Sequence, residues 1–207
     1  MFITFEGGEG AGKSTAIKKI VKKLETEGKE IVLTREPGGT PIGEEIRSII
    51  LNKKNTDMDV RTEALLYAAS RRQHIIQKII PSLKQGKIVL CDRFLDSSLA
   101  YQGYARGIGI EKVYEMNLFA TEGVEPDLTL FFDLDPEEGL RRIAANSQRE
   151  VNRLDVETLS FHQKVREGFL SLAKKFPHRF IVIDASQKPD EVFTRAYKEI
   201  ENILKRR

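Results

Sequence analysis

The chain has 207 residues, of which 40% are hydrophobic and 31% charged, so it is large enough to bury a substantial core. Its net charge is only +3, with both signs interspersed, which argues against a nucleic-acid partner. No apolar run approaches the length of a membrane span, and the single cysteine, Cys91, excludes an intramolecular disulfide. No signal peptide is expected before a glycine-rich loop that begins so early, so we predict a cytoplasmic protein without a membrane partner.

Five short apolar runs punctuate the chain, at 2–5, 31–33, 88–91, 128–132 and 180–183. They are nearly continuous rather than alternating, and they are rich in β-branched and aromatic residues, as is typical of strands buried on both faces. Helical patterns fill the intervals between them. We therefore predict an α/β fold, a five-stranded parallel sheet with helices on both faces, in a single domain over 1–207.

The helical patterns have recognisable ends. The first follows the loop after 2–5, and Gly28 is a plausible C-cap for it. A long helix is predicted over 61–80, ended by Pro81. Two further helices are predicted over 155–176 and 189–205.

A phosphate-binding loop follows the first predicted strand. The segment fits G-x-x-x-x-G-K-[ST] and leads directly into a helix, which is the context the motif needs. Its glycines allow backbone N–H groups to converge on an anion at the helix N-terminus, where Lys13 adds a mobile charge and the Ser14 hydroxyl can bind Mg²⁺. The loop residues are Gly7, Gly8, Glu9, Gly10, Ala11, Gly12, Lys13 and Ser14. We therefore predict a protein that binds a nucleoside triphosphate.

Polar residues also end the other predicted strands, where ligands bind in open α/β sheets. Asp92 follows the third strand, as the second Mg²⁺-site carboxylate does in phosphate-loop enzymes, and Arg93 is next to it. Asp133 and Asp135 follow the fourth strand, and a turn-forming role explains them as well as a functional one.

Two groups of residues are suited to a planar second ligand. Tyr67 and Arg71 lie one helical turn apart, so an aromatic ring and a guanidinium share a face, although a core tyrosine and a surface arginine would give the same pattern. Ser97, Tyr101 and Gln102 combine small, aromatic and amide groups just past a strand end.

A polar stretch between two helical patterns has the character of a mobile lid, which we place at about 141–155. It contains Arg149 and Arg153. The histidines, His74, His162 and His178, show neither zinc-ligand spacing nor a Ser/His/Asp arrangement, and we interpret them as structural.

With these residues assembled, the chain resembles the thymidylate kinase (dTMP kinase) family along essentially its whole length. The resemblance is carried by the phosphate loop with Thr15 and by Arg-Glu-Pro-Gly-Gly at 35–39. It extends through 63–72, Asp-Arg to Gly at 92–107, Pro-Asp-Leu-Thr at 126–129 and Asn-Arg-Leu-Asp at 152–155. It matches the bacterial type, whose lid rather than phosphate loop carries an arginine. The resemblance implies the fold of the phosphate-loop nucleoside monophosphate kinases, ATP and dTMP as substrates, and a homodimer.

The resemblance also implies site residues in overlapping groups. Those implied to bind ATP are Gly7, Gly8, Glu9, Gly10, Ala11, Gly12, Lys13, Ser14 and Thr15. Those implied to bind dTMP are Glu9, Arg35, Arg47, Tyr67, Arg71, Arg93, Ser97, Ser98, Tyr101 and Gln102. Those implied in catalysis are Lys13, Arg93, Arg149, Arg153 and Glu9, while Ser14 and Asp92 organise Mg²⁺.

Two other functions are compatible with a phosphate loop alone. One is a kinase for a different nucleoside monophosphate. The other is a nucleotide-dependent switch, which would hydrolyse its nucleotide without an acceptor and would lack a base-shaped second pocket; the tyrosine, arginine and glutamine groups argue against it.

Overall fold

The computed structural model of the chain describes residues 1–145 and 153–206. Its strands are β1 (Phe2–Gly7), β2 (Ile31–Arg35), β3 (Ile88–Asp92), β4 (Leu128–Asp133) and β5 (Phe180–Asp184). They form one parallel sheet in the order β2-β3-β1-β4-β5, which confirms the predicted five-stranded α/β architecture. Each strand extends slightly beyond its apolar run because the first polar residues still pair with the neighbouring strand.

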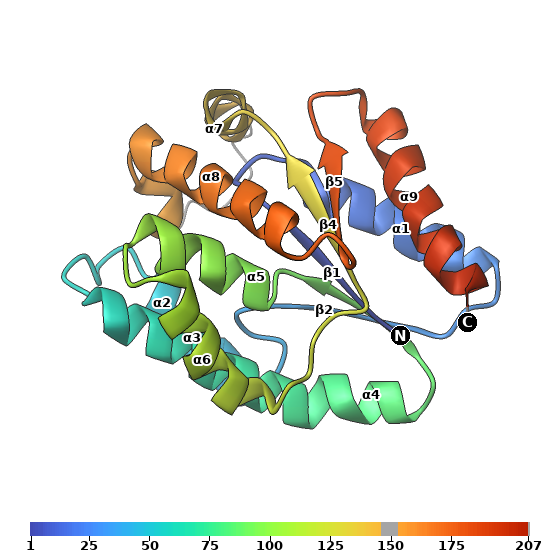
Figure 1. Cartoon of the computed structure of the whole chain (residues 1–207), viewed down its shortest axis with the longest axis horizontal. Helices are drawn as coiled ribbons and strands as arrows, with labels where there is room; N and C mark the ends of the chain where they lie inside the picture. Colours follow the sequence, from blue (N-terminus) through green and yellow to red (C-terminus); the bar gives the residue numbers. More distant parts are fainter. Residues whose placement is uncertain (146–152, 207) are drawn as a thin grey trace.

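Helices cover both faces of the sheet (Figure 1). α1 (Lys13–Thr26) and α9 (Pro189–Lys205) lie together on one face, and α5 (Leu95–Ser98) and α8 (Leu159–Lys175) lie on the other. In the described parts of the chain, no helix is both long and apolar enough to cross a lipid bilayer.

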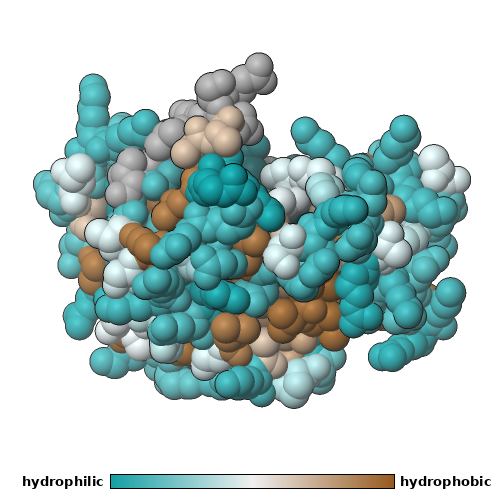
Figure 2. Space-filling view, turned by 90° about the horizontal axis from the view of Figure 1, so that it is seen from above, coloured by the Kyte–Doolittle hydropathy of each residue, from teal (hydrophilic) through white to brown (hydrophobic). Residues whose placement is uncertain are grey.

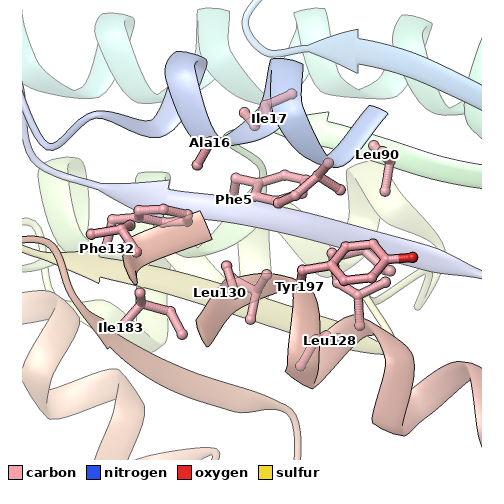
Figure 3. Packing of buried hydrophobic residues seen from close by; sticks show 14 of the residues in the cluster. Phe5, Ala16, Ile17, Leu90, Leu128, Leu130, Phe132, Ile183 and Tyr197 are labelled. Atoms are coloured by element: carbon pink, nitrogen blue, oxygen red, sulfur yellow. The ribbon is translucent and has the colours of Figure 1, made fainter. Parts of the chain in front are cut away.

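Adjacent residues of β4 supply the cores on the two faces. Phe132 packs with Phe5 beneath α1 and α9 (Figure 3), whereas Phe131 points the other way and stacks on Phe169 of α8 at 4.9 Å between ring centroids. Because successive side chains of a strand alternate between faces, a strand covered on both sides needs apolar residues at every position. This explains the continuous apolar runs in the sequence.

The remaining helices lie around the β2 and β3 side of the sheet and in the connections. They are α2 (Pro41–Leu51), α3 (Val60–His74), α4 (Ile80–Lys84), α6 (Ile110–Thr121) and α7 (Pro136–Ala144). α3 packs against both α2 and α6. Two π-helical segments, Ile75–Ile79 and Leu99–Ala105, continue α3 and α5, and a short 3₁₀ helix occupies Arg153–Val156.

The prediction that Pro81 ends the long helix was wrong. The π-helical turn passes directly into α4, whose first turn contains Pro81, so the helical path continues through a residue that has no N–H to donate. The wider turn pairs the Ile80 N–H with the Ile75 carbonyl, and the buried side chains of Ile75 and Ile79 hold the turn against the core.

The start of the helix predicted from residue 155 is also corrected. α8 begins at Leu159, because the Thr158 side chain accepts a hydrogen bond from the Phe161 N–H at 3.2 Å and caps it. α9 has the predicted bounds, Pro189–Lys205.

The strand order creates the crevice where the site lies. β1 connects to β2 at the sheet edge, β3 returns between them, and β4 lies on the opposite side of β1. Connections therefore leave β1 and β3 in opposite directions, which opens a crevice at their carboxyl ends. Phe5 pairs with Asp92, so the loop after β1 and the residues after β3 lie side by side.

Candidate active site

The phosphate loop joins β1 to α1 in a conformation that depends on glycine. Gly10 and Gly12 have φ values of +70° and +78°, and α1 begins at Lys13. The Lys13 ammonium donates to the carbonyl oxygens of Gly7 and Gly8, both at 3.0 Å. The lysine is thus folded back over the loop, beside the N-terminus of α1, the end of a helix that attracts anions.

Burial lowers the pKa of Lys13 to about 8, and the positive charge of Arg93 contributes in the same direction. The neighbouring carboxylates of Asp92 and Glu9 oppose this change. The folded protein therefore holds the cations of Lys13 and Arg93 close together against their electrostatic repulsion. An anionic phosphate placed between them would relieve this repulsion.

Arg93 follows β3 in a left-handed backbone conformation, with φ of 67°. Its N–H donates to the Phe5 carbonyl oxygen at 3.0 Å. Its guanidinium donates to Glu9 Oε1 at 2.5 Å and Ser97 Oγ at 3.2 Å, and it lies 5.1 Å from the ring centroid of Tyr101. Burial opposes its charge, but Tyr101 and Glu9 raise the pKa of Arg93 well above its usual value, so it stays charged.

One cavity of about 570 Å³ brings most of the predicted site residues together. The loop and its helix line one part, and residues at the ends of β2 and β3 and on α2, α3, α5 and the segment after α5 line another, with α7 also contributing. The predicted residues that line it are Glu9, Gly10, Ala11, Gly12, Lys13, Ser14, Thr15, Arg35, Arg47, Tyr67, Arg71, Asp92, Arg93, Ser97, Tyr101 and Gln102. Gly7, Gly8 and Ser98 do not line it: the two glycines bond to Lys13, and Ser98 accepts a bond from Arg71.

The face shown in Figure 2 lies at the top of Figure 1, the side toward which β4 and β5 point. Hydrophilic residues dominate this face, with hydrophobic residues visible between them. A hydrophilic surface at the carboxyl ends of the strands is suited to charged, water-soluble ligands.

Arg71 is 1% exposed and is fixed by acceptors of the protein. Its Nε donates to Glu36, its Nη1 to Ser98 and Asn117, and its Nη2 to the Phe94 carbonyl oxygen, at distances from 2.5 to 3.0 Å. A guanidinium has five N–H groups. These four bonds leave one Nη2 N–H for an acceptor in the cavity.

Glu36, which the sequence did not identify as a site residue, organises this corner. It binds Arg71 through Oε2 and His74 through Oε1, the latter at 2.8 Å, and His74 also contacts the Thr34 hydroxyl at 2.7 Å. His74 is completely buried in this network, in agreement with the structural role predicted for it. Only the position of Glu36 directly before a proline at a strand end could have drawn attention to it.

Arg35 and Arg47 line the cavity on the side of β2 and α2. Nη2 of Arg35 donates to both carboxylate oxygens of Glu44, at 3.1 and 2.9 Å, and about half of the Arg35 side chain is exposed. Arg47 donates to the Pro37 carbonyl oxygen at 2.9 Å.

Asp92 and Ser14 have the chemistry that a Mg²⁺ ion needs. Asp92 Oδ1 is buried, and no residue in 1–145 or 153–206 bonds to it, an unusual state for a carboxylate oxygen. Ser14 lines the same cavity. A hard cation with oxygen ligands would satisfy the orphaned oxygen.

The two predicted lid arginines are placed differently. Arg149 lies outside the described residues. Arg153 does not line the cavity; it is buried, donates from Nε to the Ile50 carbonyl oxygen at 2.9 Å and forms an ion pair with Glu63. This position supports a structural role for Arg153.

Sequence reasoning did not identify Arg142 as a site residue. Arg141 is exposed, but Arg142 lines the cavity, with Nη1 donating to the Ala185 carbonyl oxygen at 3.2 Å and Nε to Glu138 at 2.7 Å. Four-residue spacing from Glu138 was the only sequence signal for its orientation.

The acidic residues after β4 have structural partners. Asp135 caps α7 by accepting from the Glu137 N–H at 3.0 Å, and Asp133 forms a bidentate pair with Arg166 at 2.7 and 3.1 Å. The turn-forming interpretation therefore holds for Asp135.

A parallel sheet with a phosphate loop after its central strand, facing an arginine-rich second compartment, defines a phosphate-loop kinase of the nucleoside monophosphate class. A sequence model described as "Thymidylate kinase" matches residues 5–196. The chain belongs to the thymidylate kinase family, whose enzymes phosphorylate dTMP to dTDP with ATP in dTTP synthesis.

The relatives cover nearly the whole chain. A thymidylate kinase of Geobacillus sp. (strain WCH70) is 63% identical over 93% of this chain and 91% of its own length. One from Bacillus pumilus (strain SAFR-032) is 56% identical over 100% and 97%. The crystal structure of thymidylate kinase from Ehrlichia chaffeensis superposes with a TM-score of 0.78 at 37% identity, covering 97% of this chain and 98% of that one.

Proposed function

We propose that the phosphate loop binds ATP and that the compartment between β3 and α3 binds dTMP, so that the two substrates meet in one cavity. The single observation that supports this division is that the cavity is lined by Lys13 at one part and by Tyr67 and Arg71 at the other. On this proposal Gly7 to Thr15 hold the ATP phosphates, and Arg93 with Arg35 holds the acceptor phosphate.

The base and sugar of dTMP would be held by the groups on α3, α5 and the π-helical segment after α5. Tyr67 is buried at the cavity wall, where its ring can stack on thymine, and the remaining Arg71 N–H can donate to a base carbonyl. Tyr101 donates to Glu9 Oε1 at 3.1 Å, so these two side chains would lie against the sugar. Ser97, Gln102 and Arg47, which line the same cavity, and Ser98, which accepts from Arg71, complete the proposed pocket.

Catalysis by this site needs alignment and charge, not a base. The acceptor is a phosphate oxygen that is already ionised at neutral pH, so no proton has to be removed from it. The obstacle is the approach of two anions, and Lys13 and Arg93 provide the opposing charge at the point where they meet.

We also propose Ser14 and Asp92 as the residues that hold Mg²⁺, which would offset charge on the ATP phosphates. We propose Arg149 as the arginine of a lid at about 141–155. We also propose that the whole chain folds as one domain. Arg142 is a further candidate to contact phosphate, because its side chain lines the cavity.

The proposed activity is tested by measuring ADP release from Mg·ATP with and without dTMP. ADP release should depend on dTMP and yield one dTDP per ADP. A rate that dTMP does not change, with no dTDP formed, would contradict the proposal. Asp92→Asn should raise the Mg²⁺ concentration needed for half-maximal activity.

We propose that two copies of the chain associate through α3 and α6. These two helices pack against each other, and three large apolar side chains on them are exposed: Leu65 (58%), Leu118 (38%) and Phe119 (89%). Covering these side chains with a second copy of the chain would remove apolar surface from water, which favours association. Phe119→Asp should convert a dimer into a monomer in sedimentation equilibrium. A wild-type chain that sediments as a monomer at micromolar concentration would contradict this.

We retain the cytoplasm as the proposed location, because the donor is ATP. Fractionation of cells that express the chain tests it.

A further inference from the structure

Glu63 is a buried carboxylate that the reaction described above does not use. It lies in the first turn of α3, one helical turn before Tyr67, and is 1% exposed. It accepts a hydrogen bond from Gln102 Nε2 at 2.8 Å, two from Arg106 at 3.3 Å each, and an ion pair from Arg153. Glu63 therefore joins the cavity residue Gln102 to two cations that lie behind it.

These cations keep Glu63 ionised. Burial on its own would raise the pKa of Glu63, but Arg106, the bond from Gln102 and Arg153 together bring it below the usual value. An ionised carboxylate has no hydrogen to donate and can only accept. The group that faces Glu63 must therefore be a donor.

This requirement fixes the orientation of the Gln102 amide. Its NH₂ group must face Glu63, which leaves the carbonyl oxygen, Oε1, on the other corner of the amide plane. Gln102 is 1% exposed and lines the cavity, and no group in the described ranges donates to this oxygen. Turning the amide would place Oε1 against the carboxylate, which is repulsive in a buried site. The acceptor Oε1 is thus available to a ligand in the cavity.

We propose that Glu63 is a positioning residue that sets the choice of pyrimidine by holding the Gln102 amide with its acceptor toward the base. Thymine presents a donor, N3–H, next to the acceptor O4, and it would meet Oε1 of Gln102 and the remaining N–H of Arg71. Cytosine presents an acceptor at N3 and a donor at its amino group, so both contacts would be mismatched. This inference rests on the proposed dTMP pocket.

Glu63→Gln tests the inference, because it replaces the acceptor by an amide of the same shape. Arg106 and Arg153 would hold the new carbonyl oxygen at the position of Oε2, which places the new NH₂ against Gln102. Gln102 would then turn and present its NH₂ to the base. We expect the ratio of kcat/KM for dTMP to kcat/KM for dCMP to fall by roughly tenfold or more, the discrimination that one reversed hydrogen-bonding pair provides.

A matched control is Glu157→Gln. Glu157 also pairs with Arg106, at 2.6 Å, but has no bond to Gln102. Its replacement removes a carboxylate from the same network and should leave the dTMP-to-dCMP ratio within twofold of wild type. A loss of packing alone would lower both kcat/KM values and keep their ratio.

An unchanged ratio in Glu63→Gln, with the protein folded, overturns the inference. If that variant does not fold, Glu63→Asp gives the same test, because the shorter acid no longer reaches Gln102; an unchanged ratio overturns the inference there as well. If the wild-type protein phosphorylates dTMP and the dTMP-to-dCMP ratio of the variant equals that of wild type, only the role of Glu63 is refuted. A wild-type protein that neither binds nor phosphorylates dTMP refutes the proposed pocket and, with it, this role.

Discussion

Arg93 and Glu9 form an ion pair across the cavity, with Nη2 of the arginine 2.5 Å from Oε1 of the glutamate. Glu9 belongs to the phosphate loop, and Arg93 follows β3 in the compartment assigned to the acceptor. The pair therefore fixes the acceptor arginine relative to the donor loop, and the two substrate compartments are aligned by a direct bond between their own residues.

Arg93→Ala should lower kcat by roughly 10²- to 10³-fold. The substitution removes a preorganised hydrogen-bond donor that would stabilise the negative charge on the transferring phosphoryl group. Steady-state kinetics at saturating ATP and dTMP measure this. Arg141→Ala is the control, since the Arg141 side chain is 73% exposed and pairs only with Glu138 among the described residues; it should keep activity within about twofold of wild type. A kcat for Arg93→Ala near that of wild type is incompatible with the proposed role.

Lys13→Met should abolish turnover and leave the fold intact. The lowered pKa of Lys13, about 8, means that burying its positive charge reduces the stability of the folded chain. Methionine fills a similar volume and carries no charge to bury. We expect a circular dichroism spectrum like that of wild type and an unfolding temperature no lower. A folded variant with near-normal activity would remove Lys13 from the mechanism.

Gly10→Ala should impair ATP binding through the backbone. A Cβ at Gly10 would lie 2.1 Å from the Gly139 carbonyl oxygen, so the phosphate loop and α7 would be forced apart. Gly28→Ala is the matched control, because Gly28 has a similar φ, +72° against +70°, and no atom within 4 Å of the added carbon.

The control variant should lose only about 1 kcal/mol of stability, the cost of a left-handed alanine, and should bind ATP normally. Isothermal titration and urea unfolding of both variants measure the difference. Equal effects in the two variants would show that φ strain, not the clash, determines the result.

Glu6 should make stability depend on pH. Its carboxyl group is fully buried, accepting from the Phe94 N–H at 2.7 Å and the Ser97 hydroxyl at 2.5 Å. Burial, followed by the negative charge of Asp96, raises the pKa of Glu6 from 4.5 to about 8. Because the folded state binds the proton more tightly, this contribution to stability is complete below pH 4.5 and is lost as the pH rises to about 8.

Glu6→Gln removes this titration. Relative to the variant, the wild-type free energy of unfolding should fall by up to about 1.4 kcal/mol per pH unit within that window. Urea unfolding at pH 5, 7 and 9 gives the comparison. A difference between the two proteins that is the same at all three values would contradict the raised pKa.

The sequence predicted features that depend on local pattern. Continuous apolar runs identified the strands. The spacing of glycines and lysine identified the phosphate loop, because the backbone geometry of such a loop requires glycines and a lysine at these positions. Tyr67 and Arg71 were predicted together from helical spacing, and both line the cavity.

The features it missed depend on partners far away in the chain. Arg71 is fixed by Glu36, Ser98 and Asn117, which lie after β2, in α5 and in α6, and no local pattern relates them. Arg153 was placed in the lid by its neighbours in sequence, but its Nε bonds to the carbonyl oxygen of Ile50, 103 positions earlier. Tertiary packing determines the partners of such side chains.

Arg93 adopts a backbone conformation that glycine would reach freely, with φ of 67°. An L residue with a side chain pays about 1 kcal/mol or more there. The guanidinium offsets this strain, because it bonds to Glu9 and Ser97 and lies over the ring of Tyr101. Glycine at position 93 would relax the backbone but would abolish all three contacts, so screens that rank variants by melting temperature should retain arginine here together with the activity.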